Sequence, residues 1–168
     1  MVKLDLGCGK NKKAGFIGVD SIQFEGVDVV HDLRNPWPWK DGEVEQVHCS
    51  HFVEHLTGME RIDFFNELFR VLKPGGQATI ITPHWSNDCA YGDPTHQWPP
   101  VSEWSFMYLN KAWRDANAPH VEYVCDFDFT YGYGVDQSIA GRNPEFGQFA
   151  LKHYKNAARD IHATLTKR

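Results

Sequence analysis

The first nine residues limit the folds open to this chain more than any other segment. Residues 2–6 form a short apolar strand pattern that contains Asp5 and leads directly into the turn Gly7-Cys8-Gly9. Glycine tolerates positive φ angles and lets a ligand approach the backbone closely. Open α/β sheets bind small molecules at the carboxyl ends of their strands. We therefore expect a ligand site around Asp5 and this turn.

Strand and helix patterns alternate through the first half of the chain. Five apolar runs predict strands at residues 3–6, 16–20, 27–30, 44–49 and 77–82. Residues 57–60, Thr-Gly-Met-Glu, have the form of a capping box and predict the start of a helix. Apolar residues then recur at helical spacing until Lys-Pro-Gly-Gly at 73–76 ends the helix. This alternation predicts an α/β fold with a mostly parallel, doubly wound sheet.

The second half has less regular patterns. Residues 87–100 contain Gly, Asp and three prolines, which predicts a long loop. Residues 102–109 predict a short helix, whereas the alternating patterns at 123–131 and 161–166 predict two further strands. The segment between these strands contains several glycines, and we expect another long loop there.

Composition indicates an ordinary globular protein. The 168 residues, 42% hydrophobic and 23% charged, predict one domain over residues 1–168. A net charge of −5 disfavours tight binding of duplex DNA. The four cysteines form no C-x-x-C pair, which predicts free thiols in a reducing, cytoplasmic setting. The sequence has neither a signal-peptide pattern nor an apolar run of membrane-spanning length, so we expect no membrane association.

The spacing after Gly9 tests whether the first turn binds a dinucleotide. A dinucleotide fingerprint requires Gly or Ala three positions after Gly9, where this chain has Lys12. The next acid, Asp20, follows after 11 positions (20 − 9), whereas the ribose-binding acid is expected about 20 residues on. Residues 11–15 have room for little more than one helical turn, and a pyrophosphate binds best at a full helix N-terminus. The spacing therefore disfavours NAD.

Five motifs follow one another in a fixed order. They are D-L-G-C-G at 5–9, F-I-G-V-D at 16–20, V-V-H-D-L at 29–33, S-H-F-V-E-H-L at 50–56 and F-R-V-L-K-P-G-G at 69–76. Together they resemble the class I S-adenosylmethionine (SAM)-dependent methyltransferases, in particular type 11-like proteins of the short-looped branch L-G-C-G-x(5)-G-F-x-x-V-D. The resemblance is strong over residues 2–110 and weak over the closing strands.

The resemblance implies a Rossmann-like, seven-stranded sheet of order 3-2-1-4-5-7-6, with strand seven antiparallel. It also implies that SAM is the cofactor and S-adenosylhomocysteine the product. SAM has no phosphate, so it does not need a full helix after Gly9. The first strand starts at residue 2, and we expect the usual N-terminal lid helices to be missing. The cofactor side would then be open, or covered by a second copy of the chain in a homo-oligomer.

The expected cofactor-binding residues follow the carboxyl ends of the first four strands. They are Asp5, Gly7, Cys8, Gly9, Asp20, Ser21, Asp32, Leu33, Ser50 and His51. Asp20 is suited to accept hydrogen bonds from a ribose diol, and Asp32 from an adenine amino group while Leu33 packs on the ring. For both acids a turn or helix cap is the structural alternative.

Two histidines are candidates for the catalytic base, because imidazole titrates near neutral pH. His51 directly follows the central strand, and His96 ends the segment Gly-Asp-Pro-Thr-His at 92–96, which resembles a segment near the acceptor in many such proteins. An Asp-Pro turn with a hydrogen-bonded histidine explains His96 and Asp93 equally well. We expect Glu54 and His55 to cap and brace a helix.

A metal site is a further interpretation of Glu54-His55. Metal-binding methyltransferases, including small-RNA 2′-O-methyltransferases, read E-x-x-E-H with a later His; here His51 replaces the first Glu, and His84 and His96 lie downstream. Because E-H-L is widespread in relatives without a metal, we predict no metal site.

The methyl acceptor is the least constrained part of the prediction. The Asn/Asp-Pro-Pro-aromatic motif of nucleic-acid amino-methyltransferases is missing after the fourth strand, which disfavours DNA bases. We expect transfer to an O- or N-nucleophile of a small molecule. The alternative is a SAM-binding module without transferase activity, either regulatory or a decayed enzyme. We expect Trp37 and Trp39 to serve packing, whereas Trp85 and Trp98 fit either packing or acceptor stacking.

Overall fold

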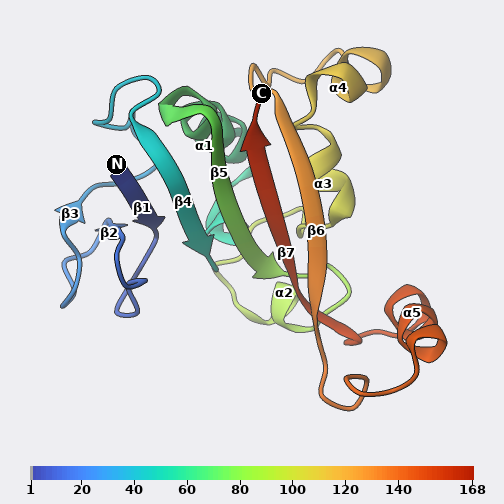
Figure 1. Ribbon diagram of the computed structural model, residues 1–168. Coiled ribbons are helices and arrows are strands. Elements are labelled where there is room, and N and C mark those ends of the chain that lie inside the picture. The colour runs from blue at the N-terminus through green and yellow to red at the C-terminus, as the bar shows by residue number, and fades with distance from the viewer. Residues whose placement is uncertain (1) are drawn as a thin grey trace.

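A seven-stranded sheet runs through the computed structural model, which describes residues 2–168 (Figure 1). The strands are β1 (Val2–Leu6), β2 (Ile17–Asp20), β3 (Val29–Val30), β4 (Val44–Ser50), β5 (Leu72–Pro83), β6 (Phe127–Val135) and β7 (Ala158–Lys167). Their order is β3-β2-β1-β4-β5-β7-β6. The first five strands are parallel, and β7 is antiparallel to both β5 and β6. The predicted order and the antiparallel seventh strand are confirmed.

Five α-helices and one 3-10 helix are described in residues 2–168. They are η1 (Val53–His55), α1 (Gly58–Val71), α2 (Cys89–Gly92), α3 (Glu103–Met107), α4 (Lys111–Asn117) and α5 (Pro144–His153). The predicted capping box is confirmed, because the Glu60 amide donates to Thr57 Oγ1 and the Thr57 amide donates to Glu60 Oε2. The predicted short helix corresponds to α3. By contrast, α5 lies where we expected only a loop, and Asn143 caps it ahead of Pro144.

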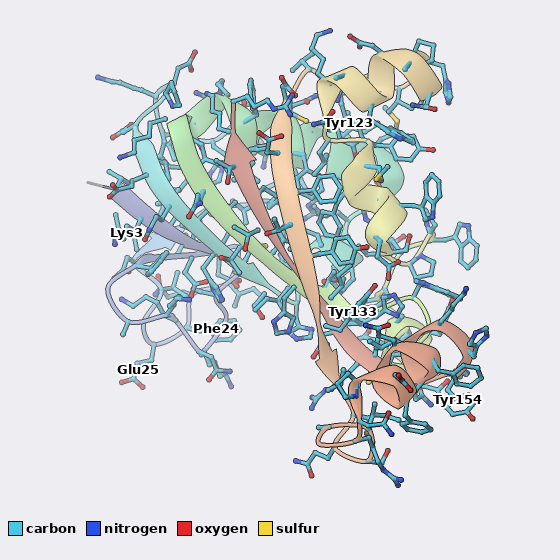
Figure 2. The ribbon with its side chains drawn as sticks, turned by 45° about the vertical axis from the view of Figure 1, so that its right-hand side comes forward. Lys3, Phe24, Glu25, Tyr123, Tyr133 and Tyr154 are labelled. Atoms are coloured by element: carbon cyan, nitrogen blue, oxygen red, sulfur yellow. The ribbon has the colours of Figure 1, made fainter. Side chains whose placement is uncertain are left out.

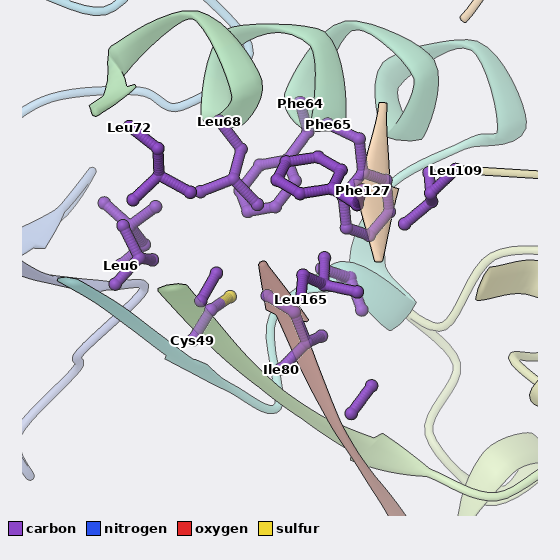
Figure 3. Packing of buried hydrophobic residues seen from close by; sticks show 14 of the residues in the cluster. Leu6, Cys49, Phe64, Phe65, Leu68, Leu72, Ile80, Leu109, Phe127 and Leu165 are labelled. Carbon is purple, nitrogen blue, oxygen red and sulfur yellow. The ribbon is translucent and has the colours of Figure 1, made fainter. Parts of the chain in front are cut away.

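The hydrophobic core lies between α1 and one face of the sheet (Figure 3). Alternate residues of a strand point to opposite faces, and on this face Leu6, Ile80 and Leu165 are completely buried. Phe64 and Leu68 of α1 are buried against them. Each such side chain contributes roughly 1.5–3 kcal/mol to folding when buried. This packing holds the central strands, and therefore their carboxyl ends, in fixed positions.

The opposite face of the sheet is polar. Register places one row of polar side chains across it, made up of Asp5, His48, Thr79, Thr164 and Thr130. Figures 1 and 2 show α1, α3 and α4 together on the other side of the sheet. These three helices therefore cover one face of the sheet, and the polar row lies on the other. Within residues 2–168, the connections from β1 to β2 and from β2 to β3 are turns, too short for crossover helices.

Other sequence predictions are confirmed or corrected by side-chain contacts. The strand predicted from residue 123 begins only at Phe127, because the amides of Val124 and Cys125 donate to Asn66 Oδ1 on α1. Trp37 is buried, its indole donates to the Leu33 carbonyl, and Trp39 packs against it, so both serve packing as predicted. No helix in the described residues 2–168 is long and apolar enough to cross a membrane.

Candidate active site

Two hollows at the carboxyl ends of the strands meet at Gly7. The β2 hollow, about 490 Å³, is lined by Gly7, Asp20, Ser21, His31, Asp32, Leu33, Arg34, Phe52, His55 and Leu56. The β4 hollow, about 680 Å³, is lined by Asp5, Gly7, Cys8, Gly9, Lys10, Asn11, His48, Ser50 and His51. Every residue predicted to bind the cofactor lines one of these hollows. The predicted set is therefore brought together at one edge of the sheet.

Glycine is required at position 7 for two reasons. Its φ of +66° lies in the left-handed region, and a Cβ there would lie 2.6 Å from Cδ2 of Phe52. At Gly9, where φ is +52°, a Cβ would meet no atom within 4 Å. The first glycine thus lets Phe52 pack against the turn, and the second leaves open space beside the backbone.

Asp5 and Asp20 hold the turn from both sides. Asp5 is buried; its Oδ1 lies 2.7 Å from His48 Nδ1, and its Oδ2 accepts a 2.7 Å hydrogen bond from the Lys13 amide. Asp20 accepts from the amides of Gly9 and Ile22, one on each oxygen. A carboxylate has about four acceptor positions, so Asp20 retains acceptor capacity toward the β2 hollow. Sequence reasoning missed His48, which the register of β4 places beside Asp5.

Asp32 is paired with an arginine that sequence reasoning also missed. The Arg34 side chain donates to both carboxylate oxygens of Asp32, at 2.7–3.2 Å, and its amide donates to Oδ1. These hydrogen bonds lower the pKa of Asp32. The preceding residue, His31, lines the same hollow, and its Nε2 is buried without a hydrogen-bond partner among residues 2–168. Such a buried polar atom calls for a ligand or water, and its position directly after β3 is a signal that sequence analysis had available.

His51 occupies a strained position between two hollows. Its φ is +54°, and backbone strain of this kind in a non-glycine residue is concentrated at functional sites. Nδ1 lies 3.3 Å from Oε1 of the buried Glu54, and Nε2 lies 3.9 Å from Oδ1 of Asp160. The Glu54 carboxylate raises the pKa of His51. The His51 ring lines both the β4 hollow and a larger outer hollow.

The outer hollow extends from His51 over the loop that follows β5. It measures about 1110 Å³ and is lined by His51, Pro83, Asp88, Cys89, Gly92, Asp93, Pro94, His96, Arg159 and Asp160. His96 therefore lies on the same hollow as His51, as the motif at 92–96 suggested. His84 does not join them: its ring bonds to Ser86 and Glu103 instead, and Tyr133 of β6 (labelled in Figure 2) also donates to Glu103.

Residues 10–80 match a family model described as a methyltransferase domain. The match covers less than half of the chain, which has the fold of solved SAM-dependent methyltransferases. The matched segment holds the four motifs from F-I-G-V-D at 16–20 to F-R-V-L-K-P-G-G at 69–76, together with most residues of the β2 and β4 hollows. A comparison with curated proteins gave no match.

Solved structures with the same fold include several methyltransferases. A SAM-dependent methyltransferase from Archaeoglobus fulgidus is 20% identical, with a TM-score of 0.70 over 98% of this chain and 85% of that one. A possible histamine N-methyltransferase from Thermotoga maritima is 15% identical, with a TM-score of 0.66 over 99% and 82%. Geranyl diphosphate C-methyltransferase from Streptomyces coelicolor A3(2) is 14% identical, with a TM-score of 0.61 over 99% and 72%. At these identities the similarity shows the fold of the domain.

The residues of the two hollows fit SAM, the cofactor that the sequence motifs imply. The buried, unpartnered His31 Nε2 offers a hydrogen bond to a nitrogen heterocycle. The open space beside Gly9 leaves room for the cofactor against the backbone. Asp20 still has acceptor positions for hydroxyl groups. The hollows therefore carry the acceptors and the space that a nucleoside with an amino-acid tail requires.

Proposed function

We propose that the domain transfers the methyl group of SAM to an oxygen or nitrogen nucleophile of a small molecule bound in the outer hollow. The observation that carries this proposal is the position of His51, whose side chain lines both the cofactor-side β4 hollow and the outer hollow. A group at that junction can contact the acceptor atom while the donor is held next to it. Positioning of this kind supplies much of the rate enhancement of a two-substrate reaction.

In this proposal, each of the two hollows binds one part of SAM. The β2 hollow takes the nucleoside: Asp20 accepts from the ribose hydroxyls, Asp32 and His31 bind the adenine edge, and Leu33 covers the ring. Asp32 shares its carboxylate with Arg34, so the adenine amino group would use a remaining acceptor position. The β4 hollow takes the amino-acid part, where the buried carboxylate of Asp5 favours a positively charged ammonium group. The other predicted cofactor-binding residues complete the walls of the two hollows: Gly7, Cys8, Gly9, Ser21 and Ser50.

His51 acts as the proton acceptor in this proposal. The Glu54 carboxylate, 3.3 Å from Nδ1, favours the neutral tautomer that carries its hydrogen on Nδ1. Nε2 then has a free lone pair. SAM supplies a methyl group on a positively charged sulfur. As the acceptor atom forms its bond to the methyl carbon and the carbon–sulfur bond breaks, the acceptor proton passes to Nε2 of His51. His96 is the second candidate for this role.

The test is turnover by a His51 variant. The protein is incubated with SAM and a panel of small hydroxyl, amine and carboxylate acceptors, and S-adenosylhomocysteine is measured by mass spectrometry. We expect His51→Ala to lower kcat by about 10²- to 10⁴-fold, the usual contribution of a general base. His120→Ala, which changes an exposed histidine outside the three hollows, is the matched control.

Three results would count against the proposal. Full turnover by His51→Ala would exclude His51 as the base, and the same measurement on His96→Ala would then test the second candidate. Calorimetric binding of SAM without turnover on any acceptor would favour a SAM-binding module without transferase activity. Absence of SAM binding at about millimolar concentration, a free energy weaker than roughly −4 kcal/mol, would contradict both ideas.

A further inference from the structure

We propose that Glu54, His55 and His96 form a binding site for one divalent transition-metal ion beside the outer hollow. The E-H-L motif alone predicted no metal. However, the tertiary structure brings one ligand atom from each of these three side chains within 4.8 Å of one another. Glu54 and His55 belong to η1, whereas His96 comes from the loop after α2. This site shares Glu54 and His96 with the residues discussed for methyl transfer, but metal binding can be tested without SAM.

The Glu54 carboxylate lacks the partners that a buried charge requires. Its side chain is 6% exposed, and neither oxygen has a hydrogen-bond partner among residues 2–168. Oε1 faces His51 Nδ1 at 3.3 Å, outside hydrogen-bond geometry. The nearby Arg61 does not compensate, because its guanidinium donates to the backbone carbonyls of Val53, Glu54, Gln97 and Pro99. A buried carboxylate that accepts no hydrogen bond is costly, and a bound cation would offset that cost.

The hydrogen bond of His55 leaves one ring nitrogen free for a metal. Thr95 Oγ1 donates its single hydrogen to Asp93 Oδ1 at 2.6 Å, so it can only accept from His55 Nδ1, which lies 2.9 Å away. His55 therefore carries its hydrogen on Nδ1 and a lone pair on Nε2. Metal-binding histidines are oriented in this way, through a hydrogen bond from the nitrogen that does not bind the ion.

The same argument holds for His96. Its Nδ1 lies 3.3 Å from the Ala90 carbonyl, which can only accept a hydrogen bond. His96 is therefore also protonated on Nδ1, with a lone pair on Nε2. The two imidazole rings lie 4.8 Å apart between centroids. In both histidines the hydrogen is thus on Nδ1, and Nε2 is left with a lone pair that can bind a metal ion.

The donor set selects the class of ion. Two neutral imidazoles and one carboxylate suit Zn²⁺, Mn²⁺, Fe²⁺ or Co²⁺, whereas Mg²⁺ and Ca²⁺ prefer oxygen ligands throughout. Three protein ligands leave coordination positions for water or for a bound molecule. Asp93, whose Oδ2 lies 3.9 Å from His96 Nε2, lines the outer hollow together with His96.

The test measures metal binding to the full, untagged chain. The protein is stripped with a chelator and titrated with Zn²⁺ and Co²⁺, using a chromophoric competitor for Zn²⁺ and visible absorption for Co²⁺. We expect one ion per chain. We expect metal binding to be weaker by about 10- to 100-fold or more in each of three variants, Glu54→Gln, His55→Ala and His96→Ala. His120→Ala, an exposed histidine away from the cluster, should bind like the unmodified chain.

Circular dichroism of each stripped variant separates lost binding from lost folding. Should Glu54→Gln fail to fold, the two histidine variants, whose rings are partly exposed, preserve the test. The proposal is overturned if the unmodified chain binds neither ion tighter than about millimolar. It is also overturned if His120→Ala weakens binding as much as the three cluster variants do.

Discussion

Phe52 packs directly over Gly7, so the segment that follows β4 closes the turn that follows β1. A Cβ at position 7 would lie 2.6–2.8 Å from three carbon atoms of the Phe52 side chain. This contact joins the β2 and β4 hollows, because Gly7 lines both. The identity of residue 7 therefore controls both the fold of the turn and the shape of the proposed cofactor site.

Gly7→Ala should destabilise the protein and weaken SAM binding. Left-handed backbone costs a non-glycine residue roughly 1–2 kcal/mol, and overpacking adds about 1–3 kcal/mol. Gly9→Ala is the matched control for stability, since its φ is also positive but its Cβ would enter open space. Urea unfolding and calorimetric SAM titration measure both effects. Equal unfolding free energies for the two variants would show that the Phe52 contact contributes nothing.

Asp20→Asn should lower the affinity for SAM by about tenfold or more, since hydrogen bonds to a charged group contribute roughly 1.5–3 kcal/mol. The reason is the loss of carboxylate acceptors facing the β2 hollow. Asp63→Asn, an exposed change on α1, should leave the affinity unaltered. Calorimetry with SAM provides the comparison. Unchanged binding by Asp20→Asn would mean that Asp20 only caps its turn.

Alkylation should identify the acceptor side of the site. Cys89 is exposed and lines the outer hollow, whereas Cys49 and Cys125 are buried. Burial raises the pKa of Cys125 to about 12 and that of Cys49 well above its usual value, so both remain protonated and unreactive near neutral pH. Iodoacetamide should therefore label Cys89 first, as peptide mass mapping would detect.

Labelling of Cys89 should also reduce methyl transfer while SAM still binds. The added group would occupy the outer hollow and exclude the acceptor. Cys89→Ser should resist this inhibition and otherwise retain activity. If the labelled protein methylates its acceptor at the original rate, the outer hollow is not the acceptor site.

The pair Glu67–Arg70 should make stability depend on pH. Arg70 donates to Glu67 and to the carbonyls of Trp37 and Trp39, and its hydrogen bonds lower the pKa of Glu67. A lowered folded pKa means that this stabilisation is present above the unfolded value of about 4.3 and is lost as pH falls through the folded value.

Glu67→Gln should therefore destabilise the protein by about 1–2 kcal/mol near pH 7 and by much less near pH 3. Urea unfolding at both pH values measures the difference. Glu25→Gln, an exposed change, should show no such effect. A Glu67→Gln deficit that is equally large at both pH values would contradict the assigned role of the charge.

Much of the fold could be predicted from the sequence, because its signals are local. Strand alternation, the capping box of Thr57 and Glu60, and the Gly-x-Gly turn each depend on neighbouring residues. The helix α5 also has a local signal, Asn143-Pro144, but the surrounding glycines favoured a loop. The gathering of the predicted cofactor-binding residues at one edge was predictable for the same reason, since they directly follow strands whose order the motifs implied.

Side-chain partnerships between distant segments were decided only by the tertiary structure. Packing joins Thr95 to His55 across 40 residues of sequence and sets His96 beside Glu54. It also places Phe52 over Gly7 and directs His84 to Glu103 instead of toward the other histidines. Local periodicity in the sequence therefore indicated the strands, and the motifs implied, through the family resemblance, the sheet order that the structure shows. Only the tertiary structure decided which polar groups meet, because loop paths and burial determine which side chains come within bonding distance.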